Sequence, residues 1–200
     1  FRGVAFEFRF KARTSRYLWN WAFAGGSTVA SFAQGAVVGA YIQGFETANG
    51  VYVGGALDWL TPFTVLTGLG MLAGYSLLGS TWLIMKTEGY LQQWAYKITL
   101  PLLLAVLVVF GIIGVWTPFV DEMVRERWFS NLSIIWVLPV LTLLCAIQIY
   151  RSVRDRRDGM PFVATMGLFI TTYLGLVVSR WPYVVPPEYT LWEAASAYES

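Results

Sequence analysis

The stretch Thr81–Gln92, TWLIMKTEGYLQ, ends a long apolar run with a lysine and a glutamate two residues apart. Lys86 and Glu88 close the second of five apolar segments, and these approach the roughly 20 residues that a helix needs to cross a bilayer. Charged residues make up 13% of the 200-residue chain, against about 25% in soluble domains. We therefore predict an all-α fold, a polytopic transmembrane helix bundle with five full crossings.

The five crossings are expected to belong to one integral-membrane domain over residues 1–200, part of a longer subunit. Phe1 and Arg2 look like the tail of an earlier helix, and the far end stops without a closing helix, so we expect a fragment that lacks both ends. Pro139 predicts a kink in the fourth crossing, and Asp58 predicts a cap on the second. The crossings are predicted at about residues 18–43, 62–85, 98–116, 132–150 and 161–178.

Basic residues divide unequally between the two sets of predicted loops. Loops 1–16, 86–97 and 151–159 hold 11 of the 14 Lys and Arg residues, whereas the opposite loops hold three. Lys and Arg concentrate on the cytoplasmic side of membrane proteins. The KTEG end of the second crossing is therefore expected to face the cytoplasm.

Small residues recur at four-residue spacing in three of the predicted crossings, which places them along one face of each helix. Such faces let neighbouring helices approach closely in lipid, where no hydrophobic force drives helices together. The alternative is that glycine is simply common in membrane helices. The glycines that we expect to pack against other helices are Gly35, Gly39, Gly70, Gly74, Gly167 and Gly175.

The sequence offers few groups for chemistry of its own. It contains no histidine, the commonest haem and metal ligand, so these residues cannot supply a His-ligated haem or a histidine-based catalytic site. Its single cysteine, Cys145, lies in an apolar run and is expected to be an inert buried thiol. Phosphate-binding loops, nucleophile elbows and zinc spacings are missing, and a net charge of +2 gives no basis for nucleic-acid binding. We predict no catalytic, cofactor-binding or metal-ligating residue in this stretch.

The candidates for function are charged residues near helix ends, where ionisable groups often mark pathways or partner contacts. Lys86 and Glu88 could reach the lipid headgroups as an anchor, or could admit protons from the cytoplasm. Arg2, Glu7 and Arg9, within FRGVAFEFR, could form a basic anchor at the membrane face or a charged contact in a subunit interface or haem environment. The residues alone leave these alternatives open.

Two classes of protein fit these observations. One is a supporting subunit of a membrane redox complex whose cofactors belong to a partner. The other is part of a multi-pass permease, which would be expected to show broken helices and polar groups near the midplane. The predicted crossings are intact and almost free of charge, which favours the first class.

Three stretches carry a resemblance to a known family. They are FRGVAFEFRFKA (1–12), DWLTPFTVLTGLGMLAGYSLLGSTWLIMKTEGYLQ (58–92) and RWPYVVPPEYTLWEAAS (180–196). Together they resemble subunit II of the cytochrome bd-type quinol oxidases, including the cyanide-insensitive branch. The middle stretch is the most specific, because the DW..PF entry, the glycine-rich crossing and the KTEG exit occur together and in order.

The resemblance implies an aerobic respiratory enzyme of the bacterial inner membrane, a heterodimer that oxidises membrane quinol and reduces oxygen to water. Haems b and d are expected in the partner, subunit I, so this chain would be a subunit that ligates no haem. A structural quinone, lipid contacts and a small accessory subunit are further expectations. Arg2 matches a family arginine that supports the haem environment, and the family's membrane-embedded acids would lie upstream of Phe1.

Overall fold

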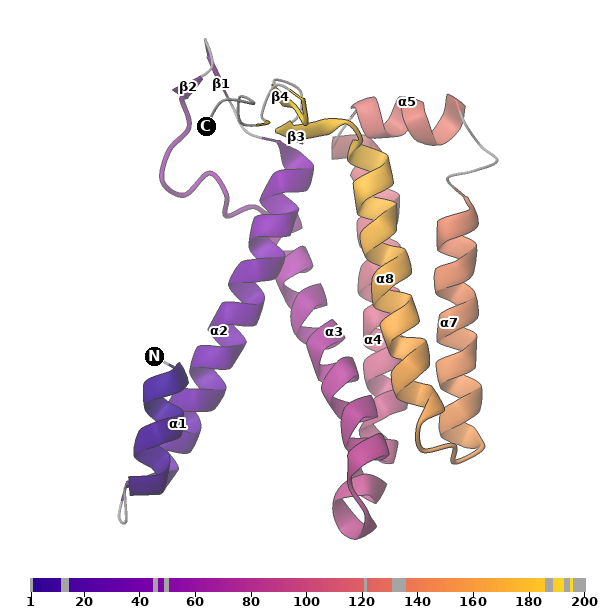
Figure 1. Ribbon diagram of the computed structural model, residues 1–200. Helices are drawn as coiled ribbons and strands as arrows, with labels where there is room; N and C mark the ends of the chain where they lie inside the picture. Colours follow the sequence, from indigo (N-terminus) through magenta and orange to yellow (C-terminus); the bar gives the residue numbers. More distant parts are fainter. Residues whose placement is uncertain are drawn as a thin grey trace.

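The protein is described here by a computed structural model, which covers residues 2–11, 15–44, 47–48, 51–120, 122–130, 136–185, 189–192 and 195. Helices dominate the structure (Figure 1). They are α1 (Arg2–Lys11), α2 (Arg16–Gln43), α3 (Pro62–Lys86), α4 (Gly89–Val120), α5 (Glu122–Ser130), α7 (Val137–Arg154) and α8 (Met160–Arg180).

Two short antiparallel hairpins lie at the same end of the molecule as α5, at the top of Figure 1. In the first hairpin, β1 (Thr47–Ala48) pairs with β2 (Val51–Tyr52). In the second, β3 (Tyr183–Val185) pairs with β4 (Tyr189–Thr190). The all-α prediction therefore holds for the membrane-sized elements, with these two hairpins as additions.

Helices α3, α4, α7 and α8 stand side by side and share one apolar core, while α2 leans against α3 and carries α1 along its lower part (Figure 1). Each of the four helices supplies fully or nearly fully buried side chains to that core because its apolar residues recur at helical spacing. They include Leu77, Ile84, Ala95, Leu103, Val106, Ala146, Ile149 and Leu168.

Four helices are long and apolar enough to cross a membrane, namely α3, α4, α7 and α8. The fifth predicted crossing is not confirmed. α2 has 28 residues, which is ample length, but it is absent from this set among the described residues. The reason is its composition, since Ser27, Thr28, Ser31 and Gln34 interrupt its apolar character.

Several predicted boundaries are wrong. Residues 89–97 were expected in a loop but form the first turns of α4, and residues 117–120 and 122–130 are also helical. Pro139 is the third residue of α7, so its missing N–H belongs to the first turn, where backbone donors have no helical partner. Pro139 therefore lies in the first turn of the helix and does not kink it.

The cap of α3 is also different from the prediction. Thr61 precedes the helix, its hydroxyl accepts from the backbone N–H of Thr64 at 3.2 Å, and the Thr64 hydroxyl accepts from the Thr61 backbone N–H at 2.9 Å. Pro62 occupies the first helical position, as predicted. Asp58 instead accepts a hydrogen bond from the backbone N–H of Gly55.

Candidate functional site

The α3–α4 turn explains the residues of the KTEG motif. Only Thr87 and Glu88 separate the two helices. The Thr87 hydroxyl donates to the Leu83 carbonyl at 2.7 Å, and the Gln92 side chain donates to the Ile84 carbonyl at 3.0 Å, so both satisfy the open end of α3. Gly89 has φ 68°, a left-handed conformation that favours glycine. The motif thus builds a tight helical hairpin.

Lys86 and Glu88 are both exposed at this turn. The Lys86 ammonium lies 5.4 Å from the centre of the Trp82 ring, a cation–π contact one helical turn away. Within the described part of the chain, no ion pair joins Lys86 to Glu88. The two charges therefore face the surroundings of the bundle, where their roles as anchor or proton entry stay predictions.

The α7–α8 turn contacts the first part of α4 at the same end of the bundle, and no sequence motif predicts this contact. The Tyr96 hydroxyl, on α4, donates to the Asp158 carboxylate, between α7 and α8, at 2.8 Å. The Arg156 guanidinium lies 4.8 Å from the centre of the Tyr96 ring, and Arg156 adopts φ 54°. Tyr96 is only 7% exposed. These contacts fasten the α7–α8 turn to the base of α4.

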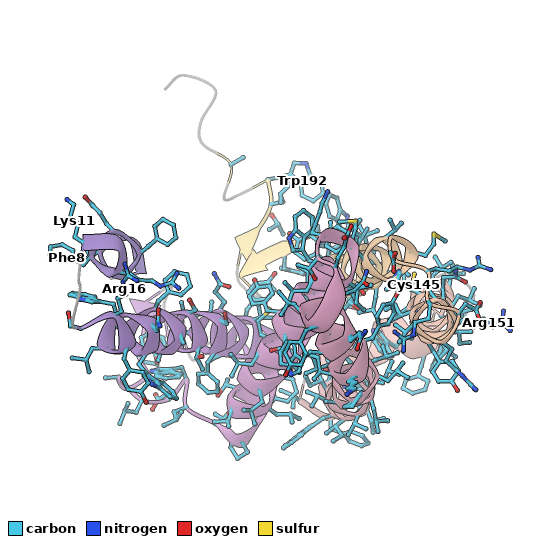
Figure 2. The ribbon with its side chains drawn as sticks, turned by 90° about the horizontal axis from the view of Figure 1, so that it is seen from below. Phe8, Lys11, Arg16, Cys145, Arg151 and Trp192 are labelled. Atoms are coloured by element: carbon cyan, nitrogen blue, oxygen red, sulfur yellow. The ribbon has the colours of Figure 1, made fainter. Side chains whose placement is uncertain are left out.

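Helix α1 packs on α2 through aromatic rings. The Phe8 and Trp19 rings stack with centres 5.2 Å apart, and the Phe6 and Phe23 rings lie 6.4 Å apart. Phe8 and Lys11 are both exposed and lie at the left edge of the molecule in Figure 2.

The two predicted charges of α1 whose side chains are described, Glu7 and Arg9, lie at the surface. Glu7 pairs with Lys11 at 3.3 Å, and both side chains are largely exposed. Arg9 is exposed as well. Arg2 begins α1, and its side chain lies outside the described atoms. An interface with another protein therefore remains a prediction for these residues.

Gly35 and Gly39 lie on the face of α2 that meets α3. A Cβ on Gly35 would lie 2.5 Å from the Thr67 carbonyl oxygen and 2.8 Å from the Gly68 Cα, both backbone atoms. A Cβ on Gly39 would collide with the Thr67 hydroxyl and lie 2.9 Å from the Thr64 Cα. The two helices are therefore in backbone contact at these positions.

The other predicted packing glycines differ in how closely a neighbouring helix approaches them. A Cβ on Gly70 would lie 2.9 Å from Val109 of α4, one on Gly74 would lie 3.0 Å from the Phe169 ring of α8, and one on Gly167 would lie 3.0 Å from the Cys145 sulfur. A Cβ on Gly175 would meet no described atom of another element within 4 Å, so close packing at this position is not seen among the described residues.

An open cavity of about 560 Å³ separates the lower part of α2 from α3 and the start of α8. Figure 1 shows the two helices diverging there. Its lining combines polar groups of Ser27, Ser31 and Gln34 with the rings of Tyr75 and Trp82. The Tyr75 hydroxyl donates to the Gln34 side-chain oxygen at 3.0 Å. The Ser27 hydroxyl oxygen is buried and has no hydrogen-bond partner among the described residues.

At the opposite end of the bundle, Arg180 is a buried cation whose structural role is not predicted from the sequence. It is 3% exposed, and its guanidinium donates to the Ile42 carbonyl in the last turn of α2. The Tyr41 ring lies beneath the guanidinium at 5.6 Å, and the Tyr41 hydroxyl donates to the Tyr183 carbonyl at 3.1 Å. The C-terminal end of α2 is favourable for a cation. Arg180 therefore joins α8 to the end of α2, and Tyr41 joins α2 to β3.

The described residues offer neither a histidine ligand for haem nor a cluster of metal-binding side chains. The sequence has no histidine, and the described residues hold no group of three or more His, Cys, Asp or Glu side chains suited to a metal. Cys145 is half-buried in the contact between α7 and α8, with its sulfur against Gly167. Met71 is packed against Gly35 at the α2–α3 contact.

Comparison with known proteins gives a consistent result. The family described as "Cytochrome bd terminal oxidase subunit II" matches residues 1–200. Similar proteins include "Probable cytochrome oxidase subunit 2" of Haemophilus influenzae and "Cytochrome bd-I ubiquinol oxidase subunit 2" of Escherichia coli K12, each 26% identical over 98% of this chain. "Cytochrome bd ubiquinol oxidase subunit 2" of Bacillus subtilis is 24% identical over 92% of this chain and 54% of its own length. The chain spans 62% of the length of the first two relatives.

Proposed function

Because the chain belongs to the cytochrome bd terminal oxidase subunit II family, we propose that it serves in a respiratory quinol:oxygen oxidoreductase as the subunit that ligates no haem. In this proposal the complex oxidises membrane quinol and reduces oxygen to water, while subunit I carries haems b and d. The single observation that carries the proposal is the family match along the whole chain. The lack of histidine in the sequence supports placing the haems in the partner.

The fold supports a scaffolding role for this subunit. Four apolar helices share a core built of aliphatic side chains, and polar side chains in that core bond to backbone or to each other. For example, Thr99 lies 3.0 Å from the Ser80 hydroxyl and donates to the Ala95 carbonyl at 2.8 Å. A rigid bundle without redox groups suits a subunit that holds a cofactor-bearing partner in place.

We place the protein in the bacterial inner membrane as a multi-pass protein, with α2 as a fifth crossing. The 28 residues of α2 extend about 42 Å, more than the roughly 30 Å of a hydrocarbon core. The α3–α4 and α7–α8 turns lie at the lower end in Figure 1. Together with the N-terminal segment, the segments that include these turns (1–16, 86–97 and 151–159) hold 11 of the 14 Lys and Arg residues. That end is the proposed cytoplasmic side.

Purification decides between this function and the permease alternative. A tagged full-length subunit should co-purify from aerobically grown cells with a haem protein, and the preparation should consume oxygen when supplied with a quinol. Deleting the subunit should lower the amount of assembled haem protein in the membrane. Isolation without any haem protein, together with transport of a solute into vesicles, would refute the oxidase assignment.

The cavity between α2 and α3 is the place where we propose a structural quinone. A quinone ring offers carbonyl oxygens that can accept from the exposed Gln34 side-chain amide, and the Trp82 ring provides an apolar wall. The Ser27 hydroxyl beside them has no hydrogen-bond partner among the described residues. Solvent extraction and mass spectrometry of the purified protein should find quinone, and Ser27→Ala with Gln34→Leu should reduce it. Ser76→Ala is a matched control, because Ser76 is exposed and donates only to its own helix, at the Leu72 carbonyl. Unchanged quinone in the double variant would contradict this placement.

A further inference from the structure

The outer face of α7 continues from apolar side chains into two arginines. Val140, Leu144 and Ile147 are 54%, 54% and 40% exposed, and the exposed Arg151 and Arg154 follow on the same face. The steps of four, three, four and three residues keep all five side chains within one narrow stripe of the helix. Figure 2, seen from below, shows Arg151 at the outer edge of the bundle, pointing away from it.

The length of α7 places these arginines at the depth of the lipid headgroups. Its 18 residues extend about 27 Å, close to the thickness of the hydrocarbon core. Arg151 and Arg154 occupy the last turn. The apolar part of the stripe therefore runs at the depth of an acyl chain, and the two cations lie where a phosphate group would be.

The acids of the neighbouring turn are engaged elsewhere. Asp155 lies 3.7 Å from the Arg157 guanidinium, and Asp158 accepts from Tyr96. The Arg154 guanidinium donates to the Tyr150 hydroxyl at 2.9 Å and lies 5.7 Å from the centre of that ring. Among the described residues, no carboxylate forms an ion pair with Arg151 or Arg154. The stripe thus presents uncompensated positive charge at its end.

We propose that this stripe, defined as Val140, Leu144, Ile147, Arg151 and Arg154, binds an anionic glycerophospholipid of the cytoplasmic leaflet. The two guanidiniums contact the phosphodiester, and one acyl chain lies along the three aliphatic residues. Charge complementarity identifies the ligand. An acyl chain alone carries no charge to attract two cations, and a zwitterionic headgroup carries no net charge. The attraction of basic residues for an anionic leaflet works in the same direction.

Native mass spectrometry of the purified membrane complex provides the main test. The probe is phosphatidylglycerol, added to the delipidated complex in a neutral detergent. Replacing both arginines, Arg151→Gln with Arg154→Gln, should weaken binding by roughly 25-fold, since each basic residue near an anionic surface contributes about five-fold. The matched control is Lys86→Gln with Lys97→Gln, which removes the same charge from exposed residues at the same end and leaves the Arg157–Asp155 ion pair in place. The control should keep its bound lipid.

Three outcomes would overturn the proposal. The first is an equal loss of phosphatidylglycerol in both double variants, which would indicate general charge attraction. The second is displacement of the lipid by millimolar inorganic phosphate, which would indicate a simple anion site. The third is tested with a photoreactive benzoylphenylalanine at position 147, in the apolar part of the stripe. Cross-linking to phospholipid supports the proposal, and cross-linking to another polypeptide would show that a protein covers this face.

Discussion

Replacing Gly35 with leucine tests the contact between α2 and α3. The first added atom, Cβ, would lie 2.5 Å from the Thr67 carbonyl oxygen, whereas ordinary contacts begin near 3.4 Å, so the helices must separate by about 0.9 Å. A gap of that size forfeits roughly a quarter to a half of the dispersion energy of each contact that it opens. The obstructing atoms are the Thr67 carbonyl oxygen, the Gly68 Cα and the Met71 Cβ, none of which a side-chain rotation can move away.

The expected loss of stability follows from this collision and from the helix propensity of leucine. Overpacking a tight contact costs about 1–3 kcal/mol, and the three further carbons of leucine place Gly35→Leu at the upper end of that range. Leucine has a better helix propensity than glycine, which offsets somewhat under 1 kcal/mol of this loss. We therefore expect a net loss of about 2 kcal/mol, or a fall in Tm of roughly 4–8 °C for a protein of this size.

The assay is thermal unfolding of the purified complex, combined with its yield. Gly25→Leu is the matched control: it makes the same substitution in the same helix, where an added Cβ meets nothing within 4 Å. Gly25→Leu should melt with the parent protein and assemble in full. If Gly35→Leu also gives a full yield and an unchanged Tm, the backbone contact does not hold α2 in place.

Three further variants test other parts of the structure. Arg2→Ala should perturb the optical spectra of the partner's haems more than Lys11→Ala does, and identical spectra would argue against a contact of Arg2 with the haem environment. Tyr96→Phe removes the hydrogen bond to the Asp158 carboxylate and should destabilise the protein by about 1 kcal/mol; denaturant unfolding without any loss would show that the bond is not needed. Arg180→Gln should loosen the end of α2, which hydrogen exchange of residues 39–43 would report as faster exchange, and unchanged protection would contradict the anchoring role.

The sequence by itself determined the membrane class, the positions of the helices and the uneven distribution of charge. Each of these rests on local properties: apolar length, helical spacing of small residues, and the count of Lys and Arg in loops. The helix at Pro62–Lys86 begins at the predicted residue and ends one residue beyond the prediction for this reason. Subunit class also followed from sequence, because three motifs occurred in order along the chain.

Helix ends were harder to predict, because they depend on how individual backbone groups are satisfied. Thr61, rather than Asp58, caps α3, and Thr87 and Gln92 close its other end so that α4 can begin at Gly89. In sequence, the residues 89–97 looked like a polar loop. Packing against the bundle converts them to helix, since Ala95 and Tyr96 are buried there.

Only the tertiary structure decided which distant residues meet. Lys86 and Glu88 are close in sequence, yet both side chains are exposed and they form no ion pair with each other. Tyr96 and Asp158, 62 residues apart, form the hydrogen bond that joins the α7–α8 turn to α4. Arg180 looked like an ordinary loop cation but is buried against the end of α2. Likewise Gly35 and Gly175 have the same spacing signal, and only Gly35 has a helix against it. Spacing defines a face of a helix, but the partner of that face is set by how the whole chain packs.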